Sequence, residues 1–112
     1  MEDIEIIFKN DYGISFHWKE KKDRVQVVFR DTGFLLNLQE VKLFQRNVLA
    51  LETETCCENC THARACKNLL LPTPSEKIDL AVSADELEQI NELLGATIFK
   101  LELLSYIELS SN

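Results

Sequence analysis

The residues best suited to chemistry lie in one short segment of the chain. All four cysteines fall within eleven positions, as Cys56, Cys57, Cys60 and Cys66, with His62 between the last two. Cys57 and Cys60 form a C-x2-C pair, a spacing that lets two thiolates hold one metal ion, and zinc takes four nitrogen or sulfur ligands in a tetrahedron. The main prediction is a Zn²⁺ ion held by Cys57, Cys60 and Cys66. Either Cys56 or His62 would supply the fourth ligand.

Other uses of these cysteines stay open. Four thiolates can also hold an iron–sulfur cluster, although none of the familiar spacings is reproduced. Cys57 and Cys60 could form a redox-active disulfide, which needs a thiol of depressed pKa; Arg64 and Lys67 favour this, whereas Glu58 opposes it. Static disulfides would require an oxidising compartment, and reduced cysteines can simply act as small buried hydrophobic residues.

Length and charge limit the classes of function. The 112 residues suit a single domain, 46% of them are hydrophobic, and 28% are charged, as in ordinary globular proteins. Twelve Lys and Arg against 19 Asp and Glu give a formal charge of −7, which argues against an electrostatic nucleic-acid binder. No apolar run is long enough to cross a membrane, and the acidic amino terminus is unlike a signal peptide. We therefore expect a cytoplasmic protein that binds neither nucleic acid nor membrane.

The first third of the chain predicts four antiparallel strands joined as a meander. Residues 4–8, 14–18, 25–29 and 34–36 are short, apolar and roughly alternating. In the second strand, Ile14, Phe16 and Trp18 are expected to face the core, which leaves His17 on the surface. Turn residues at 10–13 and 31–33 predict hairpins with Gly13 and Gly33 in left-handed backbone conformations.

Two amphipathic helices with matching starts follow the strands. Asn37 with Glu40, and Ser83 with Glu86, have the spacing of a capping box, in which two residues each bond the other's backbone N–H. The two pairs are 46 positions apart, so we interpret them as the starts of two strand–helix units. Residues 55–76 form a cysteine-rich, proline-containing connector between these units, and residues 77–82 alternate as a fifth strand.

The end of the chain allows two interpretations. After Gly95, residues 96–109 could alternate as a strand or continue the helix, and the long apolar stripe favours the helix because one glycine costs only about 1 kcal/mol. Ile98, Phe99, Leu103, Leu104 and Ile107 are too many apolar side chains for one small core. The surplus suggests a partner protein, self-association as a homodimer through this helix, or a helix buried between two layers.

Several of these segments resemble a small family of uncharacterised bacterial proteins. The resemblance rests on residues 34–40 leading into Phe44, and on residues 69–74 followed by the strand at 77–82 and the helix start at 83–87. That family has no established activity, so the resemblance implies no catalytic residue. The motifs that carry the resemblance do not include the cysteine segment.

Together these patterns predict one α+β domain spanning residues 1–112. It should contain a four-stranded antiparallel meander, a helix, the cysteine-rich connector, a fifth strand and a long carboxy-terminal helix, with both helices on one sheet face. We expect a small non-enzymatic protein-interaction module with a structural zinc ion at residues 56–66. The alternatives are a thiol redox protein acting through Cys57 and Cys60, and a scaffold with incidental cysteines.

Overall fold

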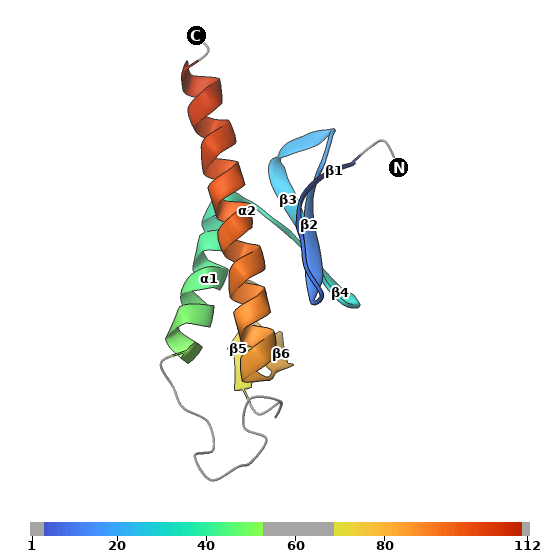
Figure 1. Cartoon of the computed structure of the whole chain (residues 1–112), viewed down its shortest axis with the longest axis vertical. Helices are drawn as coiled ribbons and strands as arrows, with labels where there is room; N and C mark the ends of the chain where they lie inside the picture. Colours follow the sequence, from blue (N-terminus) through green and yellow to red (C-terminus); the bar gives the residue numbers. More distant parts are fainter. Residues whose placement is uncertain (1–3, 53–68, 111–112) are drawn as a thin grey trace.

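The computed structural model describes residues 4–52 and 69–110, which form an α+β fold (Figure 1). The elements in chain order are β1 (Ile4–Lys9), β2 (Gly13–Trp18), β3 (Lys21–Phe29), β4 (Thr32–Leu36), α1 (Leu38–Glu52), β5 (Leu69–Pro72), β6 (Asp79–Val82) and α2 (Ala84–Ser110). Strands β1 to β4 form an antiparallel sheet in the order β1-β2-β3-β4, which confirms the predicted meander. Helix α2 continues through Gly95, so the helical interpretation of residues 96–109 is confirmed.

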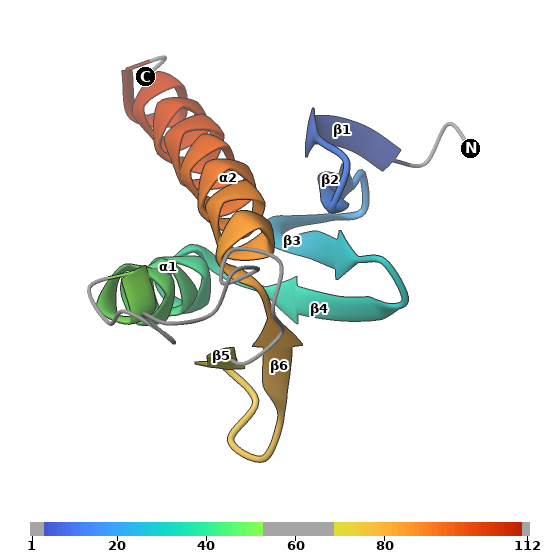
Figure 2. The same ribbon diagram turned by 60° about the horizontal axis from the view of Figure 1, so that its bottom comes forward.

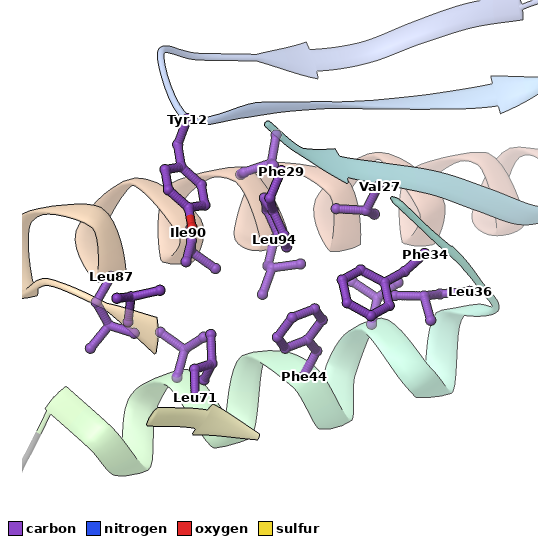
Figure 3. Packing of buried hydrophobic residues seen from close by; sticks show 14 of the residues in the cluster. Tyr12, Val27, Phe29, Phe34, Leu36, Phe44, Leu71, Leu87, Ile90 and Leu94 are labelled. Carbon is purple, nitrogen blue, oxygen red and sulfur yellow. The ribbon is translucent and has the colours of Figure 1, made fainter. Parts of the chain in front are cut away.

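Both helices pack on one face of the four-stranded sheet and enclose a single core. Alternate residues of β3, Val25, Val27 and Phe29, point into it, as their period of two predicts. Phe44 of α1 lies at right angles to both Phe29 and Phe34, with ring centroids 5.8 and 5.6 Å away (Figure 3). Such edge-to-face contacts add about 1 kcal/mol each to the burial of the rings. The aromatic cluster therefore joins α1 to the sheet.

Strand β2 turns the opposite face to the core from the one expected. Ser15 and His17 are buried, whereas Ile14 and Phe16 are only partly buried and Trp18 is exposed. Ser15 and His17 pair directly with Val27 and Val25 of β3, and paired residues share a face of the sheet. The prediction that His17 lies on the surface and Trp18 in the core is therefore wrong. The physical reason is the close approach of α2, whose Thr97 hydroxyl lies 2.7 Å from the Ser15 hydroxyl.

The hairpin turns also differ from the expectation. No glycine in the described part of the chain has a positive φ; the left-handed residue is Arg30, with φ of 57°. Phe29 pairs with Thr32, so the β3–β4 loop consists of Arg30 and Asp31, and Gly33 lies within β4. Gly13 is needed for a different reason: a Cβ atom there would lie 2.3 Å from the Val28 carbonyl oxygen on the neighbouring strand.

The fifth predicted strand does not join the meander. It is β6, which pairs with β5 in a separate two-stranded sheet (Figure 2). Part of the connector expected at residues 55–76 is thus a paired strand, β5. Pro72 is tolerated at the end of β5, and the following turn is closed by the Thr73 hydroxyl, which lies 2.7 Å from the Ile78 carbonyl oxygen.

Both predicted capping boxes are present. The Asn37 and Glu40 side chains each accept the other's backbone N–H at 2.9 Å. Ser83 and Glu86 do the same at 3.1 and 2.9 Å. These side chains satisfy amide groups that have no partner within the first turn of a helix, so both helices begin where the sequence predicts.

The two helices run antiparallel. Lys42, early in α1, pairs with Glu102 of α2 at 2.9 Å, whereas Gln45 lies farther down beside Asn91. Gly95 sits at this crossing, where an added Cβ would lie 3.3 Å from the Gln45 amide nitrogen. Because α1 begins only at Leu38, the last turns of α2 extend past it, as Figures 1 and 2 both show.

Candidate functional site

The predicted metal ligands lie outside the described residues. Cys56, Cys57, Cys60, His62 and Cys66 all belong to residues 53–68, between the end of α1 and the start of β5. Residues 4–52 and 69–110 contain no group of three or more His, Cys, Asp or Glu side chains placed to hold a metal ion. The zinc prediction therefore stays a prediction.

His17 is the other histidine, and it lies at the junction between β2 and α2. Its ring is 6% exposed, and its Nε2 atom has no hydrogen-bond partner among the described residues. Burial lowers the pKa of His17 below the usual value near 6.5; the carboxylate of Glu5 on β1 opposes this shift, and Lys100 on α2 adds to it. His17 is therefore a neutral side chain in the core at neutral pH.

A hydroxyl pair lies on the same buried face. Thr97 Oγ1 is 2.7 Å from both the Ser15 hydroxyl and the Leu93 carbonyl oxygen. A carbonyl oxygen can only accept, so Thr97 donates to Leu93 and accepts the proton of Ser15. The pair is fully buried and satisfied, which makes it a structural link between sheet and helix rather than a nucleophile.

The amino-terminal turns of α2 are acidic on the side away from the core. Asp85, Glu88 and Glu92 are exposed there. Glu86 in the same turns is instead buried, with a carboxylate oxygen 3.2 Å from the Arg30 guanidinium. Arg30 also lies over the ring of Tyr12, 5.0 Å from its centroid. Glu86 thus holds the β3–β4 turn against the start of α2.

The carboxy-terminal turns of α2 are apolar on that same outward side. Positions seven apart lie on one face of a helix, and the series Asp85, Glu92, Phe99 and Tyr106 changes from acidic to aromatic along it. Phe99 and Tyr106 are 68% exposed, Leu103 is 40% exposed and Ile107 is 52% exposed. We call these four side chains, Phe99, Leu103, Tyr106 and Ile107, the α2 stripe.

The α2 stripe lies on the side of the helix opposite its buried face. On the core side of the same helix, Leu93, Leu94 and Thr97 are fully buried, and helical geometry places Phe99 and Leu103 on the opposite side. Tyr106 and Ile107 also belong to the last turns of α2, which project past the start of α1 (Figure 1). In the described part of the chain, no helix is both long enough and apolar enough to cross a membrane.

Comparison with known proteins gives one result. The full length of the chain, residues 1–112, matches a family described as "Family of unknown function (DUF6686)". The chain belongs to this family. The match agrees with the resemblance seen in residues 34–44 and 69–87, and it assigns no activity to the family's members. Searches of curated proteins and of solved structures found no match.

Sequence reasoning found only part of the α2 stripe. Phe99, Leu103 and Ile107 were among the surplus apolar residues, but Tyr106 was not. The seven-residue series from Asp85 to Tyr106 contained the missing information, because it shows that one helix face changes character halfway along. Ile98 and Leu101, by contrast, are partly buried against the core.

Proposed function

We propose that this protein is a protein-interaction module whose binding surface is the α2 stripe. The observation that carries the proposal is the exposure of four large apolar side chains on one helix face. With two aromatic rings, they present roughly 400 Å² of apolar surface, the size of the largest apolar patch on a typical monomeric protein, which is often functional. Other exposed apolar side chains, such as Leu49 on α1 and Leu70 on β5, are not part of this surface.

A photoreactive amino acid tests this surface directly. Placed at position 99 or 106 in cells that produce the protein, it should give defined protein adducts after irradiation. The matched control is position 49, a leucine exposed on a helix outside the stripe. Adducts at 99 and 106 but not at 49 would support the proposal; equal labelling at all three positions, or none, would contradict it.

We also propose that residues 56–66 bind one structural zinc ion in a cytoplasmic setting that keeps the thiols reduced. The support is the residue types and the spacing: four cysteines and one histidine within eleven positions supply more than the four ligands that zinc needs. A structural site would tie together the chain between α1 and β5. Neither proposal includes a catalytic step.

Elemental analysis of freshly purified protein tests the zinc proposal. One zinc per chain is expected, with loss of the metal in a Cys57→Ser, Cys60→Ser double variant. A metal-free protein whose four thiols react freely with a maleimide would overturn it. A reversible two-electron potential that disappears in Cys57→Ser would instead support the thiol redox alternative.

A further inference from the structure

We infer that the α2 stripe binds the same stripe of a second copy of this chain, with the two helices antiparallel. This inference rests on the proposed interaction surface and names its partner. It follows from three features of α2: the neutrality of the stripe, the acidic row that precedes it and the projection of the helix past α1.

The first feature is local charge. The chain carries a formal −7, so two copies repel each other over most of their surface. Between residues 93 and 107 of α2 there are only two charged residues, Lys100 and Glu102, which cancel. Glu102 is in addition paired with Lys42 of its own chain. The stripe is thus a surface on which two such acidic molecules can meet without bringing like charges together.

The second feature sets the direction of the partner helix. In a parallel pair, the outward acidic row of Asp85, Glu88 and Glu92 would run beside its own copy at a helix–helix distance of about 10 Å. In an antiparallel pair centred on Leu103, Glu92 lies eleven residues from the centre. The two acidic rows then begin about 30 Å apart, beyond the screening length of about 8 Å at physiological salt. Like-charge repulsion therefore selects the antiparallel arrangement.

The third feature is the room around the projecting turns. Because α2 extends past α1 (Figures 1 and 2), an antiparallel helix can lie along the stripe while the body of the second copy lies beyond the end of the first. A two-fold axis at Leu103 pairs this residue with its own counterpart and places Phe99 opposite Ile107 of the second copy. The same patch is used on both copies, as a two-fold interface requires.

The size of the stripe places the expected contact in the class of weak, transient interfaces. Roughly 400 Å² per copy is about half of the 800 Å² that each partner contributes to a standard stable interface. We therefore expect a reversible dimer with a dissociation constant in the micromolar range rather than a permanent one.

Sedimentation equilibrium of the purified full chain, from about 1 to about 500 μM, tests this inference. The wild-type chain should pass from monomer to dimer. Leu103→Lys should weaken association at least tenfold, because it places two like charges at the two-fold axis. Leu49→Lys makes the same change on an exposed leucine of α1 and should dimerise like the wild type. Circular dichroism must show equal helix content in all three proteins.

The direction of the pair is tested by a photoreactive amino acid at position 99 of the purified protein, with crosslinks mapped by mass spectrometry. Crosslinks to residues 103–110 of the second copy are expected, and crosslinks to residues near 99 would overturn the antiparallel arrangement. A wild-type chain that stays monomeric at 500 μM would overturn self-pairing altogether. If the chain is monomeric but a photoreactive residue at position 99 still gives adducts of another protein in cells, the proposed interaction function survives. If it gives no adducts, both self-pairing and the interaction function are overturned.

Discussion

At the scale of single residues, two glycines serve different purposes. At Gly13, a Cβ atom would lie 2.3 Å from a backbone oxygen of β3, which cannot move without breaking the strand pair. We expect Gly13→Ala to lower the free energy of unfolding by about 2 kcal/mol or more. Chemical denaturation measured by circular dichroism would show this, and a loss under 0.5 kcal/mol would contradict the close approach.

Gly95 is the matched comparison, because the atom that meets its added Cβ is the flexible end of Gln45, 3.3 Å away. That amide can move by a few tenths of an ångström, while alanine removes the cost of a glycine inside a helix. Gly95→Ala should therefore leave the free energy of unfolding unchanged or raise it, by up to about 1 kcal/mol. A clear destabilisation would mean that the Gln45–Asn91 contact, and not helix propensity, decides the result.

His17 makes stability depend on pH. Its pKa is lowered in the folded protein by burial, so the unfolded chain takes up a proton at a higher pH than the folded one. The stabilisation is complete above about pH 6.5, the ordinary pKa of histidine, and is lost as the pH falls through the lower, folded-state value. Denaturation curves between pH 7.5 and pH 5 should thus show falling stability.

The control for this prediction is His17→Phe, which keeps a ring in the core and cannot titrate. The difference in unfolding free energy between wild type and variant should change between pH 7.5 and pH 5. Any contribution from His62 is present in both proteins and cancels in this difference. A difference that is constant with pH would contradict the assignment to His17.

At the scale of elements, the two helix starts were predictable and the buried face of β2 was not. Asn37 and Ser83 act through their immediate neighbours, so their spacing to Glu40 and Glu86 is enough to predict the caps. The face of β2 depends on a distant residue, Thr97, whose hydroxyl meets Ser15. Alternation alone turns the larger apolar side chains inward, and nothing local shows that α2 comes close enough to require a small one.

The conformation of the β3–β4 turn and the β5–β6 pair were also not predicted from the sequence. Arg30 takes a left-handed conformation that sequence rules reserve for glycine or asparagine, and its side chain meets Glu86 and Tyr12, which are remote in sequence. Strand β6 pairs with the neighbouring β5 in a local hairpin, and this was missed because Pro72 made residues 69–72 read as part of the connector rather than as a strand. Of the candidate sites, the cysteine segment was found by spacing, while the α2 stripe required knowing which helix face is buried.

The caps themselves give a prediction for α2. Ser83→Ala removes the side chain that accepts the Glu86 N–H, in a buried setting, and should cost about 1–2 kcal/mol of unfolding free energy. Ser105→Ala makes the same change at an exposed position within the same helix, where alanine is the better helix former. It should be neutral or slightly stabilising. Equal losses in the two variants would show that the Ser83 cap contributes nothing.

At the scale of the whole molecule, net charge opposes the association that the α2 stripe favours. Two copies with a formal charge of −7 repel through the solvent, whereas the contact itself is apolar and nearly neutral. Raising ionic strength from about 0.01 M to about 0.15 M shortens the screening length from about 30 Å to about 8 Å. This weakens the repulsion between the two bodies and leaves the apolar contact unchanged.

The dimer should therefore become tighter with added salt, which is the opposite of an association held by ion pairs. Sedimentation equilibrium at the two salt concentrations should give a severalfold smaller dissociation constant at the higher one. Leu49→Lys changes the formal charge of each copy from −7 to −6 and should reduce the salt effect while keeping the dimer. If salt instead dissociates the dimer, opposite charges must hold the copies together, and the contact must lie on charged residues elsewhere on the surface rather than on Phe99, Leu103, Tyr106 and Ile107.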